Sequence, residues 1–258
     1  MGNNLPVLKL KDCDSAEKLK QYSLNKGKSH KKYKKYATYF LSKDKIDNFV
    51  LNDGCLWDDS DDAGNLKNRK NKVYAMCFCC QESEDYSLWK AYTSGENSDD
   101  AAILDLPRRK ITKIISEHTI QLFDCEGGSC ELKKEEYDLY LADIIYKARK
   151  INDRYIHRDE YETLNNQVES GNGFLIKNYE YVNEKECRLV LEIKCDSAKY
   201  KNYHIAKIFF DENIIEDNDI IVWSNDKHSS RKYRKSSVAE HTRSCCNEKN
   251  TKKCKKFL

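Results

Sequence analysis

The sequence is poor in the two residues that interrupt regular structure, with 2 Pro and 9 Gly in 258 residues. This scarcity excludes a collagen-like or low-complexity chain. Long apolar runs are also missing, because no stretch approaches the roughly 18 uninterrupted apolar residues of a membrane-spanning helix. The N-terminal region has no apolar segment typical of a secretory signal, and Pro6 stands where N-myristoylation needs Ser or Thr. We therefore expect a cytoplasmic chain without a membrane partner.

Common catalytic and metal-binding signatures are absent as well. The chain has no G-x-S-x-G, H-E-x-x-H or Walker-type phosphate loop. The acidic run at 58–62 lacks the alternating ligand order of a calcium loop, which favours a solvated loop. Cys245 and Cys246 are adjacent, and seven residues separate them from Cys254, a poor spacing for tetrahedral zinc even with His241. We therefore expect no bound metal.

What the chain does contain suffices for one large domain, since 39% of its residues are hydrophobic and 34% are charged. It also has 12 cysteines. In a reducing cytoplasm most cysteines are small buried hydrophobes, and Cys77, Cys79 and Cys80 lie in an apolar, strand-like run. A cysteine nucleophile would need a histidine and an orienting acid near it in space, which the sequence alone does not show.

Charge is distributed unevenly along the chain. Residues 227–258 hold eleven Lys and Arg against two acidic residues, a net charge of +9, whereas residues 1–226 carry −6. A basic tail favours an anionic partner, above all nucleic acid, through neutralisation of phosphates; a merely solvated tail is the alternative. We expect a basic lead-in at 1–32, an α+β domain at 33–225 and a basic tail at 226–258.

Hydrophobic patterning predicts an α+β fold with a mixed or antiparallel sheet as its core and packed helices. A turn is predicted at Gly127-Gly128, and the longest helical pattern runs over 134–168. Shorter helices are predicted at 42–51 and at 83–92, and residues 9–35 show only weak helical periodicity. Strands are predicted at 33–41, 55–57, 73–80, 101–106, 111–115, 119–125, 174–177, 186–194, 204–210 and 220–223.

The most informative strand is the one that contains Glu184, Glu186 and Arg188. Because strand side chains alternate, these three residues are predicted on one face, with Cys187 and Leu189 on the other. Two carboxylates and a guanidinium on one face make a candidate polar site. The alternative is the solvated outer face of a half-buried strand.

The same residues belong to a longer motif. Phe174-Leu-Ile-Lys177 is followed by Tyr181 and then by Glu184-x-Glu186-x-Arg188. This order resembles a hallmark of the bacterial domain of unknown function 2971 family, which has a Lys, an aromatic residue and an E-x-E-x-R strand near the C-terminal end of its domain.

The resemblance continues upstream and covers roughly residues 33–225. Tyr36 and Tyr39 lie in an aromatic opening strand, and residues 51–57 match a short helix, turn and small strand of the family. Cys77-Phe78-Cys79 followed by Leu88-Trp89-x-x-Tyr92 matches a further block. The chain departs from the family at 58–62, where acidic residues replace its usual Asn-Asp-Pro element.

The layout of this family in turn resembles that of mono-ADP-ribosyltransferases, which implies NAD as co-substrate. The resemblance implies that Glu186 stabilises the cationic ribose that develops as nicotinamide leaves, and that Glu184 orients or deprotonates the acceptor. The residues implied to bind the dinucleotide are Tyr36, Tyr39, Trp89, Tyr92, Lys177 and Arg188.

An enzyme of this kind that modifies nucleic acid, held by the basic tail, would harm its own host. The resemblance therefore implies a toxin or phage-defence effector with a neutralising partner, an antitoxin or a chaperone. The alternative function is a non-catalytic module that binds nucleic acid or a protein partner through its basic ends. The two functions differ in whether they depend on Glu186.

Overall fold

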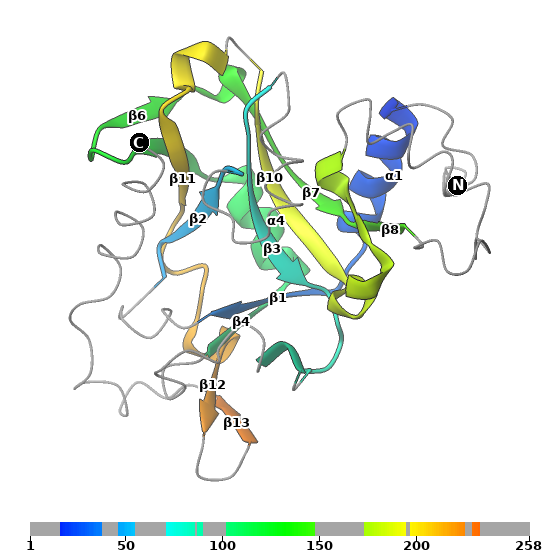
Figure 1. Ribbon diagram of the computed structural model, residues 1–258. Helices are drawn as coiled ribbons and strands as arrows, with labels where there is room; N and C mark the ends of the chain where they lie inside the picture. The colour runs from blue at the N-terminus through cyan, green and yellow to red at the C-terminus, as the bar shows by residue number, and fades with distance from the viewer. Residues whose placement is uncertain are drawn as a thin grey trace, which may run out of the picture.

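The computed structural model describes residues 16–37, 46–54, 71–85, 87–89, 102–147, 173–194, 197–224 and 229–232. Most of this part of the chain is one large antiparallel sheet (Figure 1). Its eleven strands are β1 (Lys32–Ala37), β2 (Asn48–Asn52), β3 (Val73–Cys79), β4 (Ala102–Pro107), β5 (Thr119–Asp124), β6 (Ser129–Leu132), β7 (Tyr137–Asp143), β10 (Glu186–Ile193), β11 (Tyr203–Phe209), β12 (Ile220–Ser224) and β13 (Ser229–Lys232).

The sheet is branched at β3. Its main path runs β13-β12-β4-β1-β3-β2-β11-β5-β6, while β10 pairs with β3 and carries β7 on its other side. Each pairing within this sheet is antiparallel. The short strands β8 (Ile145–Lys147) and β9 (Ile176–Asn178) pair in parallel. The helices are α1 (Ala16–Gly27) and α4 (Arg108–Ser116), with 3-10 turns η4 (Lys134–Glu136), η6 (Gly173–Leu175), η7 (Tyr179–Glu184), η8 (Ser197–Tyr200) and η9 (Asp217–Asp219).

Strand β10 is the centre of the fold, because each of its eight residues is buried. It pairs with β3 from Glu186 opposite Cys79 to Glu192 opposite Val73, and with β7 on the other side. One face, with Cys187, Leu189 and Leu191, joins the main hydrophobic core. The predicted alternation of β10 is thus present, but the polar face is covered as well, so the alternative of a solvated outer face is wrong.

Helix α4 closes the main core, and it corrects a prediction. Residues 111–115 were expected to form a strand, yet they lie in the helix that begins after Pro107. Ile111 and Ile114 are fully buried in the core that also contains Leu189 of β10. Apolar residues three apart lie on one face of a helix, and burying each such side chain stabilises the fold by about 1.5–3 kcal/mol.

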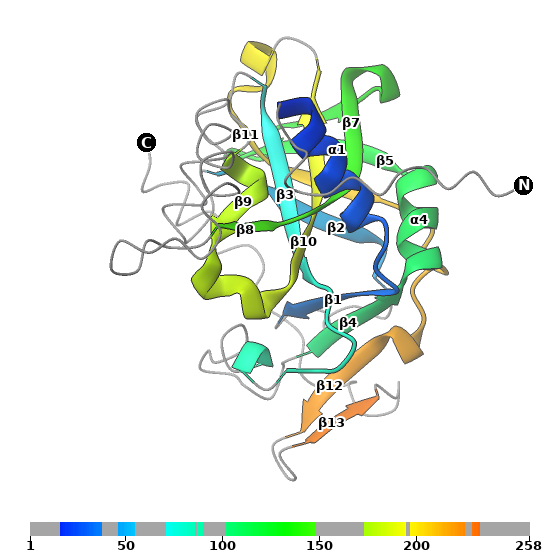
Figure 2. The same ribbon diagram turned by 90° about the vertical axis from the view of Figure 1, so that its right-hand side faces the viewer.

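Helix α1 packs along the edge formed by β7 (Figure 2). The hydroxyl of Ser23 donates to the carbonyl oxygen of Asp143 at 2.5 Å, and Lys20 pairs with Glu192 of β10 at 2.9 Å. Leu19 is fully buried. The helix lies within the basic lead-in expected at 1–32, so this part of the lead-in belongs to the packed fold.

Gly27 permits the close approach of α1 to β7. A Cβ atom at this position would lie 2.7 Å from the carbonyl oxygen of Leu141, which is main-chain and cannot move aside alone. We expect Gly27→Ala to lower the free energy of unfolding by about 1–3 kcal/mol, the typical cost of overpacking. Urea unfolding measures this, with Asn25→Ala on the exposed side of the same helix as the control. An unchanged unfolding midpoint for Gly27→Ala would contradict the close packing.

The remaining predictions of secondary structure are partly confirmed and partly wrong. The helix predicted over 134–168 is wrong at its start, where η4, β7 and β8 lie; residues 148–172 are outside the described part. Within 42–51, residues 48–51 belong to β2 rather than to a helix, and 174–177 divides between η6 and β9. The strands predicted at 33–41, 73–80, 101–106, 119–125, 186–194, 204–210 and 220–223 are confirmed by β1, β3, β4, β5, β10, β11 and β12 over their described residues.

The predicted turn at Gly127-Gly128 joins β5 to β6, with Gly127 at a φ of 94° that favours glycine. Cys125, beside this turn, is disulfide-bonded. The expectation that most cysteines are small buried thiols holds for Cys79 and Cys187, whereas the free thiols of Cys77 and Cys80 are only partly buried. Within the described residues, no helix is long and apolar enough to cross a membrane. The strand predicted at 55–57 and the acidic run at 58–62 lie outside those residues.

Candidate functional site

Glu186 is the first residue of β10, and its carboxylate is held from two sides. Arg188, two residues further on the same face, donates its Nε–H to Oε1 of Glu186 at 2.5 Å. The ammonium of Lys177, from β9, lies 3.2 Å from Oε2. The side chain of Glu186 is 3% exposed and that of Arg188 is 0% exposed. The polar face of β10 is therefore a buried ionic cluster.

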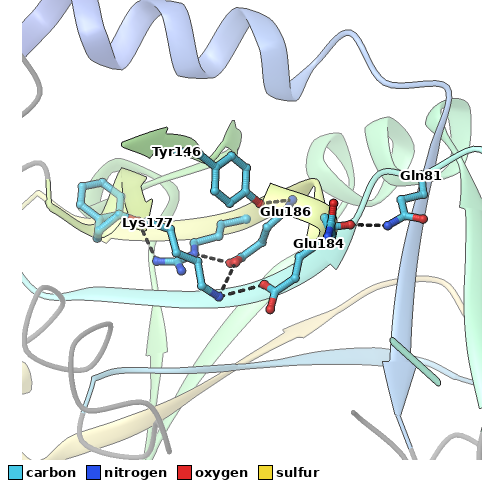
Figure 3. A network of polar contacts seen from close by, with 8 residues as sticks. Gln81, Tyr146, Lys177, Glu184 and Glu186 are labelled. Carbon is cyan, nitrogen blue, oxygen red and sulfur yellow. Dashed lines mark hydrogen bonds and ion pairs between the residues drawn. The ribbon is translucent and has the colours of Figure 1, made fainter. Parts of the chain in front are cut away.

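Lys177 also joins Glu184 to this cluster (Figure 3). Its ammonium lies 2.9 Å from Oε2 of Glu184, so it bridges the two carboxylates, and it lies over the ring of Tyr181 at 4.5 Å. Glu184 was predicted on the same strand as Glu186, but it ends η7. Lys185 between them adopts a left-handed backbone with φ 43°, and this turn places Glu184 beside the start of β10. Glu184 is the more accessible carboxylate, with 17% of its side chain exposed.

Three groups that the sequence did not point to complete the surroundings of this cluster. The main-chain N–H of Glu186 donates to the hydroxyl of Tyr146, at 2.7 Å. Arg188 donates from Nη1 to the carbonyl oxygen of Phe174 at 2.7 Å. Gln81 donates its amide to the carbonyl oxygen of Asn183, which ties the end of β3 to η7 (Figure 3). Each of these contacts involves a main-chain group. Because main-chain groups are the same in nearly all residues, the sequence could not predict these contacts.

The cluster keeps Glu186 ionised. Burial opposes the charge, but the charges of Arg188 and Lys177 and the hydrogen bonds from Arg188 and Cys77 outweigh it, lowering the pKa of Glu186 from 4.5 to about 2. Burial is also the main reason that the pKa of the Cys77 thiol is raised. The Glu186 carboxylate can therefore act as a fixed negative charge near neutral pH, and it is too weak a base to take up a proton.

The lowered pKa predicts a loss of stability in acid. A carboxylate whose pKa is lower in the folded chain contributes stability that is complete above its unfolded pKa and is lost as pH falls through the folded value. Between pH 5 and pH 2, we expect Glu186 to account for a loss of about 3 kcal/mol in the free energy of unfolding. Urea unfolding at stepwise pH measures it. If Glu186→Gln shows the same pH dependence as the unmodified chain, the assignment to Glu186 is wrong.

The aromatic residues expected to bind a dinucleotide lie near this cluster but are covered. Tyr36 and Trp89 are 4% and 2% exposed, and their rings pack edge to face with centroids 5.6 Å apart. They share a small apolar cluster with Cys79, which lies opposite Glu186 in the sheet. Trp89 donates its indole N–H to Glu84 at 3.2 Å. Tyr39 and Tyr92 lie outside the described residues.

The described residues therefore bring together Glu184, Glu186, Lys177 and Arg188, with Tyr36 and Trp89 packed next to them across Cys79. Among the residues that the structure describes, no group of His, Cys, Asp and Glu side chains is arranged to hold a metal ion. His241, Cys245, Cys246 and Cys254 are outside this part of the chain.

Comparisons of the chain with family models, with curated proteins and with solved structures find no match. The resemblance to the domain of unknown function 2971 family and to mono-ADP-ribosyltransferases thus rests on the motif residues alone.

Proposed function

We propose that the chain is a mono-ADP-ribosyltransferase-like enzyme, which cleaves NAD and transfers ADP-ribose to a macromolecular acceptor. The observation that carries this proposal is the pair of carboxylates at the junction of η7 and β10, bridged by Lys177. Glu186 is fixed on the central strand, whereas Glu184 is on the turn before it. Such a pair supplies one rigid and one more accessible carboxylate at the same place.

Glu186 has the properties that cleavage of the nicotinamide–ribose bond requires. As this bond breaks, positive charge develops on the ribose, as in glycoside hydrolysis. A carboxylate held in place before the reaction stabilises that charge more than it stabilises the uncharged ground state. A carboxylate offers about four lone-pair sites, and Arg188, Lys177 and Cys77 use three of those of Glu186. Since this side chain is 3% exposed, acceptance of a ribose hydroxyl requires that the carboxylate become uncovered.

The other residues take supporting roles in this proposal. Glu184, the more accessible carboxylate, orients or deprotonates the acceptor. Arg188 is fully buried, so its role is to position Glu186 rather than to bind the dinucleotide. Lys177 holds both carboxylates and is more exposed than Arg188, so it is the cation proposed to contact a phosphate. Stacking of nicotinamide or adenine on Trp89 requires that this ring become uncovered.

The basic tail supports an acceptor class, and the resemblance to ADP-ribosyltransferases implies the biological role. The +9 charge of residues 227–258 supports a nucleic acid, DNA or RNA, as acceptor. Modification of nucleic acid inside a cell would make the chain a toxin or phage-defence effector, controlled by a neutralising protein. The alternative is a non-catalytic module that binds nucleic acid or a partner through its basic ends.

The two functions are separated by incubating the purified chain with NAD labelled in its adenylate part, together with DNA, RNA or cell lysate. The enzyme releases nicotinamide and transfers label to one acceptor, and it loses both activities in Glu186→Gln. Glu192→Gln is the matched control, because Glu192 is a buried carboxylate on the same strand with its own partners, Lys20 and Tyr140. No nicotinamide release with any acceptor, combined with salt-sensitive binding of nucleic acid, would support the binding module instead.

A further inference from the structure

A second group of reactive side chains lies on the opposite face of β10 from Glu186. Neighbouring residues of a strand point to opposite faces, so Cys187 lies on the other side from Glu186 and Arg188. Cys80 follows the last residue of β3, and Asp143 ends β7 directly opposite Cys187. His30, between α1 and β1, reaches the same place. These four residues, Cys80, Cys187, His30 and Asp143, are called the thiol cluster below.

Contacts within the thiol cluster form a continuous chain. The Nε2 atom of His30 lies 2.8 Å from Oδ1 of Asp143. The side chains of Cys187 and His30 are both near enough to the Cys80 thiol to change its pKa. The thiol of Cys187 donates to the carbonyl oxygen of Gly27 at 3.9 Å. Cys80 and Cys187 are free thiols. A sulfur nucleophile is activated when a histidine lies beside the cysteine and an acidic side chain orients that histidine.

The surroundings favour a thiolate at Cys80 and a thiol at Cys187. The neighbouring thiol of Cys187 is the largest influence and, with His30 and against burial, it lowers the pKa of Cys80 to about 7. The hydrogen bond to Asp143, followed by that to Cys80, raises the pKa of His30 to about 10, so His30 remains an imidazolium beside the sulfur. Burial and the neighbouring Cys80 raise the pKa of Cys187.

The groups that face Cys80 come from each element packed around it. They are His30, Asp143 of β7, Cys187 of β10, the neighbouring Cys79 and the Tyr33 hydroxyl of β1, which donates to the carbonyl oxygen of Gly27 at 2.6 Å. Cys187 is fully buried, whereas Cys80 is only partly buried and the side chain of His30 is 23% exposed. A small reagent therefore reaches Cys80 first, and Cys187 is shielded behind it.

We propose that Cys80 and Cys187 form a redox-active dithiol that reacts by thiol–disulfide exchange with small-molecule disulfides. The Cys80 thiolate attacks one sulfur of the disulfide, forming a mixed disulfide and releasing one thiolate. Cys187 then attacks Sγ of Cys80, which forms the Cys80–Cys187 disulfide and releases the second thiolate. The two protein sulfurs are oxidised, the small disulfide is reduced to two thiols, and the protons from Cys80 and Cys187 go to these products.

The position of the two cysteines in the sheet allows this bond. The N–H of Cys80 donates to the carbonyl oxygen of Lys185 at 2.9 Å, so Cys80 is the diagonal neighbour of Cys187 across an antiparallel pair. Diagonal positions are slightly further apart than a disulfide requires. Cys80 lies just beyond the end of β3. Forming the bond therefore requires a small shift of this segment, which the N–H of Cys80 holds to Lys185 and the carbonyl oxygen of Gln81 holds to Lys34.

The test uses the full chain under native conditions with 4,4′-dithiodipyridine, a small disulfide that releases a coloured thiol, and peptide mass spectrometry. We expect Cys80 to react first, and the product to contain a Cys80–Cys187 disulfide without bound thiopyridine. Cys187→Ala should stop at the mixed disulfide on Cys80, whereas Cys80→Ala should lose the fast reaction. Cys130, a partly buried free thiol on β6, is the comparison within the same chain.

The pH profile separates an activated cysteine from a merely accessible one. We expect the reaction at Cys80 to reach half its maximal rate near pH 7, and Asp143→Asn to move this midpoint toward the ordinary value of about 8.5. Urea unfolding of each variant verifies that it is folded. A stable mixed disulfide at Cys80 in the unmodified chain, or a reaction no faster than that of Cys130 at pH 7, would overturn the proposal. Neither outcome depends on NAD cleavage.

Discussion

Replacing Glu186 by Gln is expected to reduce nicotinamide release from NAD about 10²–10³-fold, the range found when a preorganised electrostatic group is removed from an active site. Gln has nearly the same shape but carries no charge. Its single carbonyl oxygen can replace only one of the two oxygens that accept from Arg188 and Lys177. The loss should appear mainly in kcat, because the carboxylate matters most when the ribose becomes cationic. The measurement is steady-state nicotinamide release with the best acceptor found.

Controls for this prediction come from the same part of the fold. Glu192→Gln removes a buried charge from the same face of β10, where Tyr140 donates to it at 2.8 Å, and it should keep most of the activity. Glu184→Gln should reduce transfer to the acceptor more than it reduces hydrolysis of NAD, since its proposed role is to orient the acceptor. If Glu186→Gln remains folded and retains full activity, the proposed chemistry is wrong.

The candidate site could be predicted from the sequence as far as alternation along one strand allows. Glu186 and Arg188 are two apart, so their shared face follows from strand geometry alone, and their ion pair is present. Glu184 could not be placed in the same way, because the left-handed turn at Lys185 ends the regular alternation. The burial of Arg188 was also not predictable, since it depends on residues 173–178 covering β10.

Long-range pairing explains the main error in the fold. Residues 137–143 have apolar side chains at spacings compatible with a helix, but each of them pairs with β10, some fifty residues later in the sequence. Local periodicity carries no information about such a partner, and tertiary contacts override weak helix propensity. The thiol cluster was missed for the same reason. Its His30, Cys80, Asp143 and Cys187 come from four separate segments, and only the sheet brings them together.

Replacing Arg188 by Met is expected to produce the largest loss of stability, about 3–5 kcal/mol in the free energy of unfolding. Removing one partner of a buried ion pair leaves the other charge uncompensated. Glu186 would keep Lys177 as its neighbouring cation, and the carbonyl oxygen of Phe174 would lose the donor on Nη1 of Arg188. Urea unfolding at pH 7 measures the change. Lys194→Met is the control, because its pair with Asp138 is exposed and should contribute less than about 1 kcal/mol.

A second substitution separates the role of Arg188 in stability from its role in the proposed reaction. In the double variant Arg188→Met, Glu186→Leu no buried charge is left without a partner on β10, and apolar replacement of a buried pair is often neutral or stabilising. We expect this variant to regain most of the lost unfolding free energy, yet to have no NAD-cleaving activity. If it is as unstable as Arg188→Met alone, the loss comes from packing of the Arg188 side chain instead. Recovery of stability without activity would mean that the fold does not need the ion pair. Its role would then be to hold Glu186 in place for catalysis.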